Sequence, residues 1–269
     1  MTPAPPGRAA HRIVAVAVCV LTSVIGLGVG AGQTEAGGSA VHGANLSVGA
    51  STSLDWAGYA VTGAPVHTVA GSWTQPTVTC PGPKLQQSAF WVGIDGFAGN
   101  DQTVEQVGTD ADCTKRTAHA PSHPLHYAWY ELYPDDLVVL PPATYPVAPG
   151  DVLTASVAVS GTSYVIDIAD AGRWTFTTTQ TPSVVPANAS AEWITEAPTL
   201  CTGRCKVMQL ASFGTVHFTG ATVDGSTVAA SGRTIQSITM TTKKAVAVKA
   251  APTLLAPGGS AFDVVWQHV

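Results

Sequence analysis

Apolar and polar residues alternate along most of the chain in short segments separated by turn residues. Clear examples lie at residues 56–61, 69–73, 152–157, 163–168, 174–178 and 261–266. Alternation with period two is typical of a strand, whereas an amphipathic helix needs apolar residues at i, i+3, i+4 and i+7, and no long stretch of the chain shows that spacing. The chain also contains 27 glycines and 19 prolines, which suit the turns. The pattern predicts an all-β protein, folded as a sandwich or barrel.

The first forty residues follow another pattern. A basic start precedes a nearly unbroken apolar run at 13–29, and small and polar residues follow at 31–36. This order is typical of a cleaved secretory signal. A retained membrane anchor is the alternative, but the run barely reaches the roughly 20 residues that span a bilayer. We therefore expect a signal peptide and short leader over 1–40, one domain over 45–269, and a secreted protein without membrane contact after cleavage.

The charge composition narrows the range of partners. Charged residues make up 11% of the chain, and Lys and Arg together number 12. A surface so poor in positive charge is unsuited to nucleic acid or to an anionic membrane. Few bases also mean little repulsion between cations once the carboxylates are protonated. We expect no nucleic-acid partner, a monomer, and tolerance of an acidic medium.

Four cysteines remain after the predicted signal is removed: Cys80, Cys113, Cys201 and Cys205. An even set in an exported chain suggests two disulfides. Of the possible pairings we favour Cys201 with Cys205, because residues 202–204 can close a tight turn, and this leaves Cys80 with Cys113. A zinc site is disfavoured because the two couples lack paired C-x-x-C knuckles.

Four of the predicted strands carry polar side chains on one face, because side chains alternate between the two faces of a strand. The sets that share a face are Trp91 with Asp95; Gln102, Val104 and Gln106; Tyr127, Trp129, Glu131 and Tyr133; and Glu192 with Glu196. If these faces line a single sheet, they form a groove of carboxylates, a carboxamide and indole walls, which is the makeup of a polymer-binding site. Alternation alone leaves Glu192 and Glu196 equivalent.

Six motifs in a fixed order make the chain resemble the glutamic peptidases, or eqolisins. They are DWAGY at 55–59, VAGSW at 69–73, WVGIDG at 91–96, QVGTD at 106–110, AWYELYP at 128–134 and AEWITE at 191–196. Several co-linear motifs are far more specific than any one of them. The resemblance implies a β-sandwich of two antiparallel sheets, of the concanavalin or jelly-roll type, and an acid endopeptidase that acts on proteins or peptides without a cofactor or metal. It also implies insensitivity to pepstatin.

The resemblance further assigns the catalytic pair to Gln106 and Glu196 and makes Glu192 a neighbour on the same face. An ionised Glu196 would take a proton from water as it attacks the scissile carbonyl, and would later return it to the leaving amine. The amide of Gln106 would donate to the developing oxyanion, and an uncharged donor does not titrate in acid.

Around this pair, Trp91 and Trp129 are expected as walls of the groove, with Asp95, Asp110 and Glu131 as supporting acids. Crowded carboxylates cannot all ionise, so some of them should keep protons well above the usual pH, and stability should fall as pH rises.

Two features of the chain depart from the fungal members of this family. Tyr127 stands where those enzymes carry an Asp, which makes the set of acids smaller. The stretch between the signal and Trp56 is also too short for their sizeable inhibitory propeptide, so activation is expected to need no zymogen step.

Plainer interpretations stay open for several of these residues. Trp91 and Trp129 fit ordinary core aromatics, Asp95 fits a turn acid before Gly96, and Glu192 fits a solvated strand residue. As for function, a jelly-roll glycoside hydrolase would use Glu131 and Glu196 as acid and nucleophile about 5 Å apart, and a lectin-like binding module would have the groove without the catalytic pair.

Other chemistries are less favoured by the residues. His119, His123 and His126 could suggest metal ligands, but two prolines bar a regular helix there, and we expect a surface loop. A Ser-His-Asp hydrolase is disfavoured because the chain has no G-x-S-x-G elbow.

Overall fold

The computed structural model describes four ranges of the chain, which are residues 47–98, 102–118, 120–201 and 205–268. The predicted signal peptide and leader lie outside the described residues, and so does His119. Within the described ranges the chain forms strands and one short 3-10 helix, and no helix there is long and apolar enough to cross a membrane.

The elements follow one another along the chain in this order: β1 (Val48–Ser53), β2 (Trp56–Thr62), β3 (Thr68–Thr74), β4 (Ala89–Ile94), β5 (Val104–Cys113), β6 (Pro124–Tyr133), β7 (Val138–Val139), β8 (Val152–Ser160), β9 (Ser163–Asp170), β10 (Trp174–Gln180), β11 (Ser190–Glu196), β12 (Thr199–Cys201), β13 (Cys205–Val207), β14 (Thr215–Val223), β15 (Ser226–Thr227), β16 (Thr234–Thr241), η1 (Lys243–Ala245), β17 (Val248–Pro252) and β18 (Phe262–Trp266).

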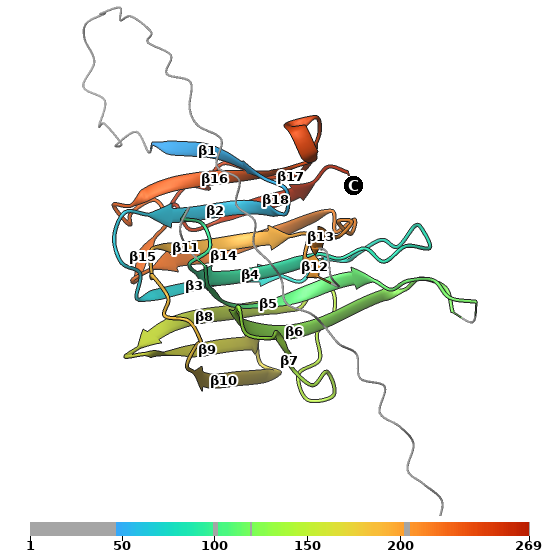
Figure 1. The fold of residues 1–269 in the computed structure, drawn as a ribbon, viewed down its shortest axis with the longest axis horizontal. Coiled ribbons are helices and arrows are strands. Elements are labelled where there is room, and N and C mark those ends of the chain that lie inside the picture. Colours follow the sequence, from blue (N-terminus) through green and yellow to red (C-terminus); the bar gives the residue numbers. More distant parts are fainter. Residues whose placement is uncertain (1–46, 99–101, 119, 202–204, 269) are drawn as a thin grey trace, which may run out of the picture.

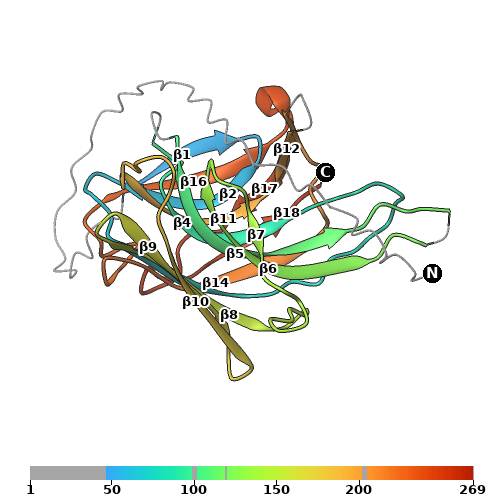
Figure 2. The same cartoon turned by 60° about the horizontal axis from the view of Figure 1, so that its bottom comes forward.

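The strands form two layers (Figures 1 and 2). One layer has the order β16-β2-β11-β4-β5-β6-β7, and the other has the order β10-β9-β8-β3-β14-β18. Contacts of β3 and β8 with β4, and of β8 and β9 with β5, show that the layers pack face to face. β17 pairs with both β16 and β18, so the hydrogen-bonded ladder continues from one layer into the other. The expected all-β sandwich is confirmed.

Antiparallel pairing joins the named strands that the structure describes, apart from one pair. β1 lies parallel to β16, with Val48 opposite Ile235 and Ser53 opposite Met240. The sequence pattern did not predict this parallel edge, because alternation gives the faces of a strand and not its direction.

The core between the layers is built from alternate residues of each strand, as the pattern predicts. In β8, Leu153, Ala155 and Val157 are buried while their neighbours are more exposed. Two tryptophans of the core, Trp73 and Trp193, are fully buried. Their indole N–H groups donate to the Thr109 hydroxyl and the Ala70 carbonyl, at 2.9 Å and 2.8 Å. Each large side chain buried in this way contributes about 1.5–3 kcal/mol.

The second face of β11, β4, β5 and β6 is named the polar face here, and it carries Glu192, Glu196, Trp91, Gln106, Asp110, Trp129 and Glu131. Every residue of β4, β5 and β11 is buried, so these strands are covered on both faces. The polar face is therefore a largely desolvated layer of side chains rather than an open surface.

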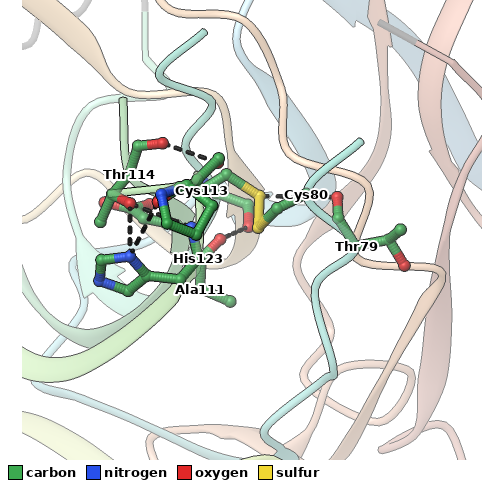
Figure 3. Close-up of a disulfide and its surroundings, with 10 residues drawn as sticks. Thr79, Cys80, Ala111, Cys113, Thr114 and His123 are labelled. Atoms are coloured by element: carbon green, nitrogen blue, oxygen red, sulfur yellow. Dashed lines mark hydrogen bonds between the residues drawn. A yellow bond between two sulfur atoms is a disulfide. The ribbon is translucent and has the colours of Figure 1, made fainter. Parts of the chain in front are cut away.

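Two disulfides join the expected partners. Cys80 in the β3–β4 connection pairs with Cys113 at the end of β5, with their Cα atoms 5.4 Å apart (Figure 3). Cys201 pairs with Cys205, with their Cα atoms 4.0 Å apart, and closes the β12–β13 hairpin. Both pairings predicted from the sequence are confirmed.

Candidate active site

The polar side chains come together because β11, β4, β5 and β6 are hydrogen-bonded neighbours in that order. The register of β5 and β6 places Gln106 opposite Glu131. On the other side of β5, Asp110 lies opposite Ala89, and Ala89 lies opposite Glu196. Directly opposed residues have their Cβ atoms about 5 Å apart, so the two predicted catalytic side chains and two further acids share one small area of the sheet.

Two glycines make room on this face for indole rings. A Cβ atom at Gly108 would lie 2.4 Å from the Phe90 carbonyl oxygen and 2.6 Å from the Cβ of Trp91. A Cβ atom at Gly93 would lie 3.0 Å from the ring of Trp91. No Cβ tolerates the first two distances, so glycine at 108 allows Trp91 and its neighbour Trp129 to cover the strand.

Glu196 ends β11 and is only 3% exposed. The indole N–H of Trp91 donates to its Oε2 at 2.9 Å. Its Oε1 has no hydrogen-bond partner among the described residues. A buried carboxylate oxygen without a protein partner is suited to bind a water molecule.

Gln106 lies in the middle of the polar face of β5 and is 2% exposed. Its Nε2 donates to Oε2 of Glu131 at 2.7 Å. A carboxamide has two N–H donors, so this bond orients the group and leaves a second donor. Its Oε1 has no hydrogen-bond partner within the part of the chain that the structure describes.

A second cluster of hydrogen bonds surrounds Asp110, which lies four residues beyond Gln106 on the same face of β5. Its Oδ1 accepts the Trp129 indole N–H at 2.6 Å, and its Oδ2 accepts the Tyr127 hydroxyl at 2.7 Å. The same hydroxyl lies 3.3 Å from Oδ2 of Asp112, which also accepts Nε2 of Gln87 at 3.1 Å. Two buried carboxyl groups are thus linked through one phenol.

These groups line a small pocket with a volume of about 40 Å³. Its polar wall consists of Gln87, Gln106, Asp110, Tyr127, Glu131 and Glu196, and its apolar wall consists of Ala89, Trp129, Leu137, Pro198 and Leu200. A volume of this size admits one or two water molecules. Both members of the predicted pair therefore face a space that can hold a water.

Burial and mutual repulsion favour protonated acids in this pocket. Burial, and then the charge of Asp112, hold the pKa of Asp110 well above its usual value. Burial raises the pKa of Asp112 to about 7. Burial, followed by the charge of Asp55, raises the pKa of Glu196 well above its usual value, while the Trp91 hydrogen bond opposes that rise. The pocket therefore keeps several protons in acidic solution.

Asp55 is a further buried acid beside the site, and the sequence reasoning gave it no role although it begins the first motif. Burial raises its pKa, while the Ser53 hydroxyl, which donates to its Oδ1 at 2.6 Å, and the charge of Lys249 oppose that rise. The buried Lys249 donates its Nζ to the Leu54 carbonyl at 2.9 Å. A charged residue next to a tryptophan at the start of a strand was the signal available in the sequence.

Metal binding finds no support among the described residues, where no group of three or more His, Cys, Asp or Glu side chains is placed to hold an ion. His123 contacts the Thr114 hydroxyl at 3.1 Å in a loop, as expected. The expectation of a surface loop is wrong for His126, which lies in β6 and is half-buried, with its Nδ1 3.1 Å from Nε2 of Gln75.

Comparison with known proteins identifies the family. The model of the Peptidase A4 family matches residues 54–253. The chain belongs to this family. Its members are the eqolisins, so the resemblance carried by the six motifs is confirmed, and the chain is a peptidase by family.

Solved structures of the same family share the fold. Scytalido-glutamic peptidase with a transition state analog inhibitor is 20% identical, with a TM-score of 0.63. SCP-B, a member of the Eqolisin family of peptidases in a complex with the tripeptide Ala-Ile-His, is 19% identical, with a TM-score of 0.58. Each comparison covers 79% of this chain and 98% of the other. No match was found among curated proteins.

Three of the residues expected around Gln106 and Glu196 do not line the pocket, namely Asp95, Glu192 and Trp91. Asp95 follows the end of β4 with a φ of 69°, so the alternation that placed it beside Trp91 stops before it. Its carboxylate accepts the backbone N–H groups of Asn188 and Ala189 at 2.7 Å and 2.6 Å. Asp95 is not among the residues that line the pocket, and its contacts agree with the alternative of a turn acid.

Glu192 shares the polar face with Glu196 but is not part of the pocket lining. It is fully buried, so the alternative of a solvated strand residue is wrong. Trp91 is also fully buried and donates to Glu196 without lining the pocket, while Trp129 does line it.

Part of the pocket wall could not be predicted from strand alternation. Gln87 lies before β4, and Leu137, Pro198 and Leu200 come from connections or a short hairpin. Their approach to the site depends on how loops fold back over the sheet, and strand alternation does not report that.

Proposed function

We propose that this member of the Peptidase A4 family is a secreted acid endopeptidase that uses Glu196 as general base and Gln106 as oxyanion donor. The observation that carries the proposal is their shared pocket: Glu196 offers an oxygen without a partner among the described residues, Gln106 offers an amide, and the space between them is the size of water. The predicted signal, the two disulfides and the scarcity of basic residues support export to an acidic medium.

The proposed reaction begins with a water molecule at Oε1 of Glu196. The ionised carboxylate removes one proton as the water oxygen attacks the scissile carbonyl carbon, and the carbonyl oxygen becomes an oxyanion. An N–H of Gln106 donates to that oxygen. Protonated Glu196 then returns the proton to the leaving amine as the C–N bond breaks, which restores the carboxylate.

Glu131 and Trp91 act on the pair through hydrogen bonds. Glu131 accepts from Gln106 at 2.7 Å and fixes the plane of the amide. Trp91 donates to Glu196 at 2.9 Å and favours its ionised form. Both partners thus orient the reacting groups before the substrate arrives.

The raised pKa of Glu196 opposes ionisation of this base in acid, and two features offset it. The indole of Trp91 stabilises the carboxylate. Repulsion from Asp55, Glu131 and Asp110 contributes to the raised pKa, and it disappears while those acids keep their protons. A single negative charge in the pocket is then stabilised on Glu196.

The test uses the chain without its predicted signal, assayed on denatured protein at about pH 3 to 4. Glu196→Gln should reduce kcat by about 10²–10⁴-fold, and Gln106→Ala should reduce it by about 10²–10³-fold. Asp136→Asn changes an exposed carboxyl after β6 and serves as the control with wild-type activity. Circular dichroism and thermal melts check that each variant is folded.

The same proteins distinguish the rival functions. Release of sugar that is lost with Glu131→Gln, without proteolysis, would support a glycoside hydrolase. Binding of saccharides without any hydrolysis would support a lectin-like module. Proteolysis that survives Glu196→Gln would refute the assignment of the base.

A further inference from the structure

The contacts of Tyr127 hold more hydrogen-bond acceptors than the phenol has protons. Its hydroxyl lies 2.7 Å from Oδ2 of Asp110 and 3.3 Å from Oδ2 of Asp112. A phenol has a single O–H donor. One O–H shared between two ionised carboxylates would leave two buried charges of the same sign beside each other, whereas both contacts become full hydrogen bonds when one carboxyl group keeps a proton and donates it to the phenol.

The described residues around the two acids supply hydrogen-bond donors, and none of them is a cationic side chain paired with either acid. Trp129 donates to Asp110, while Gln87 and the backbone N–H of Ser88 donate to Asp112. None of the ion pairs that the structure describes includes Asp110 or Asp112. An ionised pair would therefore be two buried charges of the same sign without a counter-ion, which is strongly disfavoured.

Acidic groups face this cluster from the neighbouring strands. Glu131 on β6 repels a charge on Asp110. A charge on Asp110 in turn disfavours the ionised form of Glu196 on β11. Behind β5, Gln75 contacts both the backbone carbonyl of Asp110 and His126. The ionisation of Asp110 and that of Glu196 thus compete.

We propose that Tyr127 and Asp112 are positioning residues that hold one proton in common with Asp110, so that the negative charge of the pocket stays on Glu196. The proposal rests on the proposed function and deepens it. When the shared proton leaves, Asp110 becomes negatively charged. This charge disfavours the ionised form of Glu196, and it also repels the oxyanion that develops on the substrate. Loss of this proton sets the upper pH limit of activity.

Two substitutions should move that limit in opposite directions. Asp112→Asn removes the like charge that raises the pKa of Asp110, so the alkaline limb of the kcat/KM profile should move to lower pH by about one unit. Tyr127→Phe removes the donor that favours ionised Asp110 while keeping the ring, so the limb should move to higher pH by about one unit. The shifts should appear in kcat/KM with little change of the acid limb.

Tyr130→Phe is the matched control, because this tyrosine lies on the same strand, faces the other side and packs its ring on Phe176. Its alkaline limb should coincide with that of wild type. A merely structural role of Tyr127 would lower activity at every pH without moving the limb. Limbs that stay in place, or that move together, overturn the proposal. If Tyr127→Phe does not fold, Asp112→Asn alone decides, and a limb that does not move down overturns it.

A measurement without substrate separates this proposal from the proposed function. The fall of melting temperature from acid to neutral pH should begin at higher pH in Tyr127→Phe and should be smaller in Asp112→Asn. A chain that cleaves no protein but shows these two changes in the melting curves refutes the proposed peptidase function and supports the shared proton. A chain that cleaves protein but shows neither change in the melting curves refutes the shared proton alone.

Discussion

Asp112 offers a direct way to measure what buried acids contribute to the pH dependence of stability. It is 4% exposed at the end of β5, and its carboxyl accepts hydrogen bonds from Gln87 and from the Ser88 backbone. Asp112→Asn keeps the shape of the side chain and removes its titration. The variant therefore reports the contribution of one proton site to folding.

The direction and the size of the contribution of Asp112 to stability follow from its pKa. Burial raises the pKa of Asp112 from 3.8 to about 7, so the folded protein binds this proton more tightly than the unfolded chain. Its contribution to stability is complete below pH 3.8 and is lost as the pH rises through about 7. The full difference corresponds to about 4 kcal/mol. For a domain of this size, 1 kcal/mol changes the melting temperature by roughly 2–4 °C, so Asp112 accounts for a fall of about 10 °C.

The assay is a series of thermal melts between pH 3 and 8 at constant ionic strength. Wild type should lose melting temperature steadily above pH 4, and Asp112→Asn should lose about 10 °C less by neutral pH. Asp136→Asn removes the same charge from an exposed turn and should follow the wild-type curve. Equal slopes for wild type and Asp112→Asn would show that the folded state does not hold this proton, and the reasoning from burial would be refuted.

Two further predictions concern a hydrogen bond and a disulfide. Trp91→Phe removes the donor to Glu196 and raises the pKa of that carboxyl further, so the acid limb of the kcat/KM profile should move up by about one pH unit, and an unmoved limb would argue against Glu196 as the base. Replacing Cys80 and Cys113 together by Ser opens a loop with a sequence separation of 33 and should cost about 4 kcal/mol in urea unfolding, against about 2 kcal/mol for the second disulfide with its separation of 4. Equal losses would contradict the loop-entropy argument.

The chemistry of the site could be predicted from the sequence wherever a strand continues without interruption. Period-two alternation placed Trp129 and Glu131 on one face of their strand, and the register of β5 and β6 puts Gln106 on the same side. The same rule failed at Asp95, which lies just past β4 in a turn with positive φ. Alternation is a property of extended backbone, so it carries no information beyond the last residue of the strand.

Cross-strand partners could not be predicted in this way. The resemblance to the fungal enzymes implied that Tyr127 stands where they carry an Asp, and this predicted a smaller set of acids. In the structure Tyr127 lies opposite Asp110 and also reaches Asp112, so one hydroxyl links two buried acids. Register depends on which residues of two strands face each other, and one chain read alone does not define it.

The partners of the buried acids in the pocket are uncharged donors, and this determines how the pocket responds to pH. Trp91, Trp129, Tyr127, Gln87 and Gln106 each donate to a carboxyl group, and none of them changes charge in acidic solution. An arginine in their place would hold its carboxylate ionised down to low pH. With neutral donors, the charge of the pocket depends on the number of protons that its acids hold. With Glu196 as the proposed base, such a site loses its single-charge state when the medium becomes neutral, and the proposed function therefore predicts that catalysis and stability fall over the same pH range.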